Sequence, residues 1–324
     1  MPALVTGGTG FIGAEVVRTL LGTGGPPPVL FDLNPSTTRL DDVANRVDVV
    51  RGDLGNFSHV LHAVKRARPE VIYHLGGMLS VPSDADPAAA FRTNALGTFH
   101  VLEAARLFDV PQVLFSSTVA TYALDIPEGA ITDITVQRPQ LFYGATKVFC
   151  EHMGLFYKRK YGLDFRSLRY PSIVGPGVRT PGVVQYTSWV IEESARGHPY
   201  TLVVSPETKC PVMYFKDAAR AILLLGEAPL DQIKTVNYLV AGASPVASAG
   251  ELADMVRARI PGAQIDFKPD PELQPVLDNL TQSIDDSNAR REWGWRPEYD
   301  HGRMIDDFLQ ELEEQIRIGA RLGL

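Results

Sequence analysis

The sequence has little cysteine and no excess of basic charge, and each absence excludes a class of protein. Only two cysteines, Cys150 and Cys210, occur among 324 residues, which is too few for a disulfide framework, and nothing around them has the spacing of a zinc site. Acidic residues outnumber basic ones by 38 to 31, so the net charge of -7 supplies no basic excess for gripping nucleic acid. We expect a small-molecule substrate, no metal and no nucleic-acid partner.

Long apolar runs are also lacking. No stretch reaches the about 20 apolar residues that a membrane-spanning helix needs. The first apolar run, Ala3–Val5, passes directly into glycines and has neither the basic nor the apolar region of a secretory signal. We therefore expect a cytoplasmic protein that has no membrane partner, with the composition of an ordinary globular chain.

Short apolar runs alternate with amphipathic stretches over the first half of the chain, which is typical of βαβ units. Predicted strands lie at 3–6, 29–32, 47–51, 71–75, 113–117 and 165–170. Predicted helices lie at 14–21, around 38–44, and at 58–66, 91–108 and 143–161. The pattern predicts an α/β fold, a Rossmann doubly wound parallel sheet.

The pattern of predicted strands and helices changes after residue 170. Residues 171–181, rich in glycine and proline, are predicted to form a loop that leaves the sheet. Later elements are predicted as helices at 185–196 and 216–226, a strand at 200–204 and two terminal helical segments. We expect residues 1–170 to form the nucleotide-binding domain, with elements around 211–240 returning to it. Residues 171–210 and 241–324 are then a smaller, interleaved C-terminal substrate lobe.

A glycine-rich loop follows the first predicted strand and opens the first helix. It reads G-x-x-G-x-x-G, with Gly7, Gly10 and Gly13 as the glycines and Phe11 and Ile12 between the last two. Glycines at this spacing allow a tight turn and let a pyrophosphate approach the helix N-terminus. The position directly after the N-terminal strand favours a dinucleotide site over an ordinary turn.

Two carboxylates follow the next strands. Asp32 ends the second strand, where it can bind both ribose hydroxyls of NAD and would repel a 2′-phosphate, so NAD is favoured over NADP. Arg39, a few residues on, leaves NADP as the alternative. Asp53 and Leu54 end the third strand, where a carboxylate could meet the adenine amino group, although Gly-Asp is also a common turn.

A phenol and an ammonium lie four residues apart in Tyr143-Gly144-Ala145-Thr146-Lys147, which places them on one face of a helix. A lysine cation and the positive charge of a nicotinamide would favour the phenolate, which is otherwise a poor base near neutral pH. Ser117 and Thr118 end an upstream strand and offer hydroxyls to a substrate oxygen. The spacing by itself also suits an ordinary helix surface.

Taken together, the glycine loop, the hydroxyl-tipped strand and the Tyr-Lys pair resemble an extended short-chain dehydrogenase/reductase of the NAD-dependent epimerase/dehydratase family. The likeness covers nearly the whole chain. His74-Leu75-Gly76-Gly77 resembles the family's His-Leu-Ala-Ala stretch beside the cofactor, and 94–98 resembles its Asn-x-x-Gly-Thr helix. The segment 168–171 takes the place of the one that flanks the nicotinamide.

The resemblance implies roles for these residues. Tyr143 would be the general base, Lys147 would lower its pKa and bind the nicotinamide ribose, and Thr118, or else Ser117, would hold the substrate oxygen. Ser80 would touch the substrate. Cofactor contacts would also come from Leu75, Gly76, Gly77, Asn94 and Tyr170. The family usually pairs into homodimers through the helices at 94–108 and 144–161, where an apolar face could come from Phe99, Leu102, Phe149 and Phe156, although burial within one monomer explains several of these equally well.

Within the family, the chain is similar to the epimerase-like L-threonine 3-dehydrogenases, with two departures. Their Gly-Thr-Thr run is Gly182-Val183-Val184 here, and Leu280 stands where they carry a tryptophan. Both changes remove polar partners from a pocket built for a charged amino acid. We therefore expect L-threonine to be a poor substrate and a more apolar β-hydroxy acid or β-hydroxy amino acid to be a better one, its carboxylate held elsewhere, for instance by Ser80 or Arg179.

Two alternatives share the fold. A nucleotide-sugar epimerase or dehydratase keeps the cofactor and the Tyr-Lys pair, but usually binds its diphosphate with an asparagine and an arginine. Ser172 and Cys210 stand near those two places, with Lys209 alongside. A non-catalytic NAD-sensing protein is disfavoured because such proteins tend to lose the tyrosine or the lysine.

Overall fold

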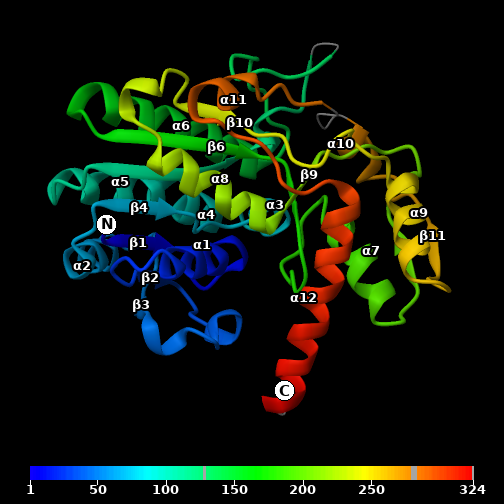
Figure 1. Ribbon diagram of the computed structural model, residues 1–324. Helices are drawn as coiled ribbons and strands as arrows, with labels where there is room; N and C mark the ends of the chain where they lie inside the picture. Colours follow the sequence, from blue (N-terminus) through cyan, green and yellow to red (C-terminus); the bar gives the residue numbers. More distant parts are fainter. Residues whose placement is uncertain (127–128, 279–282, 323–324) are drawn as a thin grey trace.

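The computed structural model describes residues 1–126, 129–278 and 283–322. A sheet of seven parallel strands runs through its centre in the order β10-β6-β5-β4-β1-β2-β3 (Figure 1). This is the strand order of a doubly wound Rossmann sheet, so the predicted fold is confirmed. Its strands are β1 (Ala3–Thr6), β2 (Val29–Asp32), β3 (Asp48–Arg51), β4 (Val71–His74), β5 (Gln112–Thr118), β6 (Asp164–Tyr170) and β10 (Asn237–Leu239).

Helices cover both faces of this sheet. One layer contains α1 (Phe11–Gly22) and α8 (Phe215–Glu227), and the other contains α2 (Phe57–Ala67), α5 (Gly97–Leu107) and α6 (Phe142–Tyr161). Successive strand residues alternate between the two layers: in β1, Val5 packs in the core beneath α1, whereas Leu4 packs in the opposite core. Because both faces are covered, β1, β2 and β4 are mostly apolar.

A second group of elements lies beside the carboxyl end of the sheet, at the right of Figure 1, and encloses its own apolar core. Two short parallel pairs, β7 with β9 and β8 with β11, form its strands. Its strands and longer helices are β7 (Ser172–Val174), α7 (Tyr186–Ala195), β8 (Tyr200–Leu202), β9 (Val212–Tyr214), α9 (Ala249–Arg259), β11 (Ile265–Phe267) and α12 (His301–Leu322). The described residues also form four shorter α-helices: α3 (Ser80–Ala85), α4 (Pro87–Ala90), α10 (Gln274–Asp278) and α11 (Ser287–Trp293).

Three predicted elements differ in detail. The helix expected around 38–44 is wrong: this stretch forms two 3₁₀ turns, Thr37–Leu40 and Ala44–Arg46, held by Arg18 of α1, which binds the Arg39 carbonyl and the Asp42 carboxylate. The loop expected at 171–181 begins with a strand, because residues 172–174 pair with β9. The helix expected from residue 91 starts as a π-helical turn, Phe91–Leu96.

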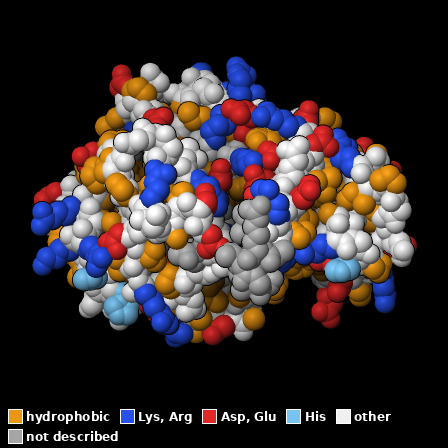
Figure 2. Space-filling model, turned by 60° about the horizontal axis from the view of Figure 1, so that its bottom comes forward, with side chains coloured by type: hydrophobic (Ala, Val, Ile, Leu, Met, Phe, Trp, Pro, Cys, Tyr) orange, Lys and Arg blue, Asp and Glu red, His pale blue; other side chains and the backbone are white. Residues whose placement is uncertain are grey.

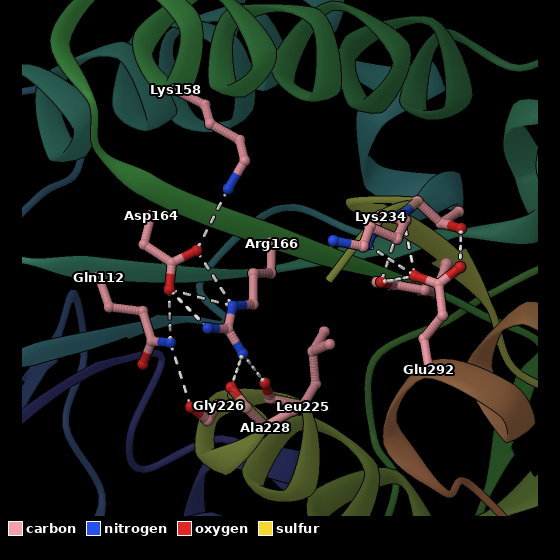
Figure 3. Close-up of polar contacts among 11 residues, drawn as sticks. Gln112, Lys158, Asp164, Arg166, Leu225, Gly226, Ala228, Lys234 and Glu292 are labelled. Carbon is pink, nitrogen blue, oxygen red and sulfur yellow. Dashed lines mark hydrogen bonds and ion pairs between the residues drawn. The ribbon is translucent and has the colours of Figure 1, made fainter. Parts of the chain in front are cut away.

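Two buried polar clusters fix the ends of β6 and β10 (Figure 3). The Arg166 guanidinium binds the Asp164 carboxylate and donates to the carbonyls of Leu225 and Ala228 at 2.5 and 2.7 Å, which ties β6 to the end of α8. The Glu292 carboxylate on α11 accepts from the backbone N–H groups of Lys234 and Thr235 just before β10. These contacts anchor β10, which is the last strand of the sheet in chain order.

On the face shown in Figure 2, Lys and Arg side chains are interspersed with Asp and Glu and form no single-sign patch. No helix in the described part of the chain is long and apolar enough to cross a membrane. Within the same residues, no group of three or more His, Cys, Asp or Glu side chains is placed to hold a metal ion.

The Arg166 cluster gives a test of stability. Arg166→Met should lower the free energy of unfolding by about 3–5 kcal/mol, because two buried carbonyls lose a charged donor and the partly buried Asp164 carboxylate loses its guanidinium partner. Lys158→Met is the matched control: Lys158 contacts the same Asp164 carboxylate at 3.3 Å but is 27% exposed, and should cost about 1 kcal/mol or less. Urea unfolding measures both, and equal losses would contradict this role for Arg166.

Candidate active site

The glycine loop between β1 and α1 lies against the backbone that follows β4. Gly7 has a φ of +66°, and a Cβ there would lie 2.8 Å from the Cα of Gly76. A Cβ on Gly13 would lie 2.1 Å from the Gly7 carbonyl oxygen. Gly10 caps α1 without a side-chain hydrogen bond. The loop thus presents backbone amides and a helix dipole to an anion, which fits a dinucleotide pyrophosphate.

Asp32 faces this loop from the end of β2. Its carboxylate accepts hydrogen bonds from the Thr9 hydroxyl at 2.7 Å and from the Thr9 backbone N–H at 3.2 Å. Both bonds go to one carboxylate oxygen, Oδ2. The side chain is thereby held at the edge of the loop, with its other oxygen directed to neither Thr9 group, which fits the binding of a ribose.

The residues expected to lie near the adenosine half of the cofactor already contact other parts of the protein. Asp53 accepts from the Gly55 backbone N–H at 2.8 Å and so closes a turn of its own. Leu54 is buried against Gly97 at the start of α5. Arg39 donates to the Gly177 carbonyl and lies over the Phe11 ring, at 5.1 Å from its centroid. The guanidinium that could have received a 2′-phosphate therefore already has two neighbours.

Gly77, Asn94 and Lys147 come together after β4. A Cβ on Gly77 would lie 3.0 Å from the Asn94 side-chain oxygen and 3.7 Å from the Lys147 nitrogen. Asn94, in the π-helical turn, accepts from the Met78 backbone N–H and donates to the Met78 carbonyl, at 2.8 and 3.1 Å. The glycine therefore leaves space directly beside the lysine ammonium, which fits the nicotinamide half of the cofactor.

Tyr143 and Lys147 lie in the first turns of α6, beside the end of β5. Lys147 is 4% exposed, and its ammonium donates to the Ser116 carbonyl at 2.8 Å. Its nitrogen lies 5.6 Å from the centroid of the Tyr143 ring. The Thr118 hydroxyl donates a hydrogen bond to the Tyr143 oxygen. The structure thus brings together the phenol, the ammonium and one hydroxyl of the strand.

Burial disfavours the charged forms of both Tyr143 and Lys147. It raises the pKa of Tyr143 to about 12, and the hydrogen bond from Thr118 opposes this only in part. It lowers the pKa of Lys147 to about 8, with Cys150 and Glu151 acting in the opposite direction. The phenol is therefore neutral near pH 7 in the protein alone, and a further positive charge is needed to favour the phenolate.

Ser117 does not join this group. Its hydroxyl donates to the Glu151 carboxylate on α6, which also binds the Arg169 guanidinium of β6 at 2.7 Å and the Gln137 amide at 3.0 Å. Sequence reasoning missed this network. The available signal was that Glu151 lies four residues after Lys147 on a helix that packs against the sheet.

Tyr170, at the end of β6, has a buried phenol. Its side chain is 4% exposed, packs in the core beneath α1 and α8, and donates to the Ala218 carbonyl at 2.8 Å. Burial raises its pKa. The phenol thereby holds β6 to α8, and the cofactor contact expected of Tyr170 stays a prediction.

The candidate substrate residues come from two segments. The Ser80 hydroxyl, at the start of α3, accepts from the Val183 backbone N–H at 3.4 Å. Val183 and Val184 are partly buried and pack against the core of the second group of elements. Arg179 is paired with the buried Glu192 carboxylate at 2.8 Å. Leu280 lies outside the described residues.

The comparisons with known proteins agree with this geometry. A profile of the NAD-dependent epimerase/dehydratase family matches residues 3–241. The mitochondrial L-threonine 3-dehydrogenase of Bos taurus is 29% identical over 316 residues, 97% of this chain and 83% of that protein.

Two solved structures are similar over nearly the whole chain. The GalE-like L-threonine dehydrogenase of Cupriavidus necator, in its holo form, has a TM-score of 0.89, 28% identity and coverage of 96% of this chain and 100% of that chain. The UDP-glucose 4-epimerase of Thermus thermophilus, in complex with NAD, has a TM-score of 0.84, 27% identity and coverage of 97% and 99%.

The burial of Lys147 has a consequence for folding. Because the pKa of Lys147 falls from its ordinary 10.5 to about 8 on folding, the unfolded chain binds one more proton between those values. Stability should therefore rise with pH in this window, by up to about 1.4 kcal/mol per pH unit from this residue. Urea unfolding at pH 7.5, 8.5 and 9.5 should show a less positive slope of stability against pH for Lys147→Met than for wild type, whereas Lys158→Met on the same helix should keep the wild-type slope. Equal slopes for wild type and Lys147→Met would contradict the buried, titrating amine.

Proposed function

The chain belongs to the NAD-dependent epimerase/dehydratase family, and on that premise we propose that it oxidises a secondary alcohol of a small hydroxy acid or hydroxy amino acid. The chain is an NAD-dependent oxidoreductase. The observation that carries the proposed reaction is the arrangement of Tyr143, Lys147 and Thr118 at the end of β5. It offers a proton acceptor, a cation and a hydroxyl donor within one buried site.

In this reaction Tyr143 takes the hydroxyl proton of the substrate, and Thr118 orients the substrate oxygen. Lys147, held by the Ser116 carbonyl, binds the nicotinamide ribose and places its charge beside the phenol. Bound NAD would supply the hydride acceptor for the carbinol carbon and a positive charge that favours the phenolate. The alcohol becomes a ketone, NAD becomes NADH, and one proton is released.

Residues at the glycine loop complete the proposed cofactor site. Gly7, Gly10 and Gly13 hold the pyrophosphate, Asp32 binds the adenosine ribose, and Asn94 with Gly77 forms the wall beside the nicotinamide. We also propose that residues 171–210 and 241–324 act as the substrate lobe. The hydrogen bond between Val183 and Ser80 supports this, because it joins residues 171–210 to the start of α3.

A nucleotide-sugar epimerase is the second candidate, and the similarity to the Thermus enzyme favours keeping it. An epimerase must bind a diphosphate, for which arginine is the usual partner. Here the Ser172 hydroxyl is within 3.2 Å of the Thr187 hydroxyl, and Cys210 is buried and uncharged. Lys209, next to Cys210 in the sequence, is a lysine rather than the usual arginine, which favours the dehydrogenase.

We further propose a homodimer formed through α5 and α6. Phe99 and Phe149 are 39% and 51% exposed, and Phe156 is 40% exposed. Exposed aromatic side chains on two adjacent helices are typical of an interface. Leu102, expected on the same face, is instead buried in the core of the monomer. A cytoplasmic location stays a prediction.

The dimer proposal predicts the effect of placing charge on this face. Wild type should have the mass of two chains by light scattering, and Phe149→Asp combined with Phe156→Asp should have the mass of one, because buried unpaired carboxylates oppose association. Leu33→Asp, a change at a residue 55% exposed just beyond β2, is the control and should leave the mass unchanged. A wild-type mass of one chain would contradict the proposal.

The role of Tyr143 is tested by its removal. Tyr143→Phe should lower turnover by about 10² to 10⁴, the usual size for loss of a general acid/base, while NAD affinity measured by calorimetry stays near wild type. Lys147→Ala should lower both turnover and NAD affinity. With NAD and a substrate in excess, wild type should accumulate free NADH, whereas an epimerase recycles it. Most activity remaining in Tyr143→Phe would show that another group is the base.

A further inference from the structure

The proposed substrate end of the site contains a polar side chain that sequence reasoning passed over. Gln185 follows the two valines and directly precedes α7. A Cβ built on Gly182 would lie 2.9 Å from the Gln185 side-chain oxygen and 3.7 Å from the Ser80 hydroxyl. The carboxamide and the hydroxyl therefore lie on the same side of Gly182, one from each of the two segments that meet there.

Gln185 is 8% exposed, yet its side chain makes no hydrogen bond to any residue that the structure describes. A ligand that binds the carboxamide would supply hydrogen bonds that no described residue supplies.

The position of Ser80 relates this group to the reacting end. Ser80 opens α3, and Asp84, one turn later, accepts from the Phe142 backbone N–H at 3.0 Å. Phe142 precedes Tyr143 at the start of α6. The same short helix thus contacts the catalytic turn through Asp84 and carries Ser80 at its start, which relates the two ends of the proposed site.

The hydrogen-bonding capacity here is mainly that of a donor. The Ser80 oxygen already accepts from the Val183 N–H, which leaves its own hydrogen to donate. Gln185 adds two N–H donors and one carbonyl acceptor. The three atoms nearest to the Gly182 Cβ position all belong to neutral side chains. Asp84 is exposed, and its carboxylate already accepts a hydrogen bond from the Phe142 N–H at the start of α6. These groups suit a carboxylate better than an ammonium, which needs acceptors or a counter-charge.

We propose that Gln185 and Ser80 bind the substrate carboxylate, and that the site selects β-hydroxy acids without an amino group over β-hydroxy amino acids. This inference rests on the proposed dehydrogenase function and narrows its substrate class. Val183 and Val184 contribute apolar surface next to the same end. The amino group of threonine would meet this surface or the single carbonyl of Gln185.

The experiment compares racemic 3-hydroxybutyrate with L-threonine, which differ mainly by the amino group, at pH 8 with NAD. Wild type should prefer 3-hydroxybutyrate by at least about 10-fold in kcat/KM, which is about 1.4 kcal/mol. Gln185→Glu keeps the shape but adds a carboxylate, and should lower or reverse that ratio by at least about 10-fold. Gln232→Glu, which adds the same charge at an exposed distant position, should leave the ratio unchanged. An unchanged ratio in Gln185→Glu, or a wild-type preference for threonine, would overturn the proposal.

A binding measurement separates this proposal from the proposed reaction. Butyrate is titrated calorimetrically into the NADH-bound protein, where no turnover occurs. Its affinity should fall at least about 10-fold in Gln185→Glu and in the uncharged Gln185→Met. If wild type reduces no NAD with either substrate but butyrate binding depends on Gln185, the carboxylate site stands and the reaction is wrong. If butyrate does not bind, or binds all variants equally, the carboxylate site itself is wrong.

Discussion

The buried ion pair between Glu151 and Arg169 is the contact on which the proposed site depends. It joins α6 to β6, and the Ser117 hydroxyl joins the same carboxylate to β5. The remaining donors of Arg169 go to the Tyr122 hydroxyl and the Asp133 carbonyl, at 2.6 and 2.8 Å. A buried carboxylate that binds this many donors restricts the arrangement of the elements around it. Because Ser116 precedes Ser117, the carbonyl that holds Lys147 is positioned by the same network.

Electrostatics explain why such a network is needed. Burial raises the pKa of Tyr143 and lowers that of Lys147, so the surroundings disfavour the charged form of both groups. Glu151, one turn from Lys147, opposes the effect on the lysine. A site of this kind is a weak base by itself and becomes a stronger one when a cation is brought beside the phenol. Under the proposed mechanism, proton transfer is therefore coupled to cofactor binding.

The sequence predicted those features that depend on local pattern. Strands β1 and β2 are where the apolar runs placed them, and the spacing of Tyr143 and Lys147 did put both on one helix beside β5. It could not predict features that depend on partners distant in the chain. Ser117 and Thr118 look equivalent in sequence, but the alternation of a strand sends one hydroxyl to Glu151 and the other to Tyr143. Arg39 is bound to Gly177, 138 residues away, and Gln185 becomes notable only because Ser80 lies beside it.

A crystal structure of the protein with NAD tests the central claim most directly. The account predicts that Lys147 keeps its hydrogen bond to the Ser116 carbonyl, 2.8 Å in the structure described here, and donates a second bond to the nicotinamide ribose. It also predicts that the Tyr143 oxygen faces the nicotinamide from the same side, with Glu151 and Arg169 still paired. A cofactor bound away from the glycine loop, or a Lys147 ammonium that leaves Ser116 and does not reach the ribose, would contradict it.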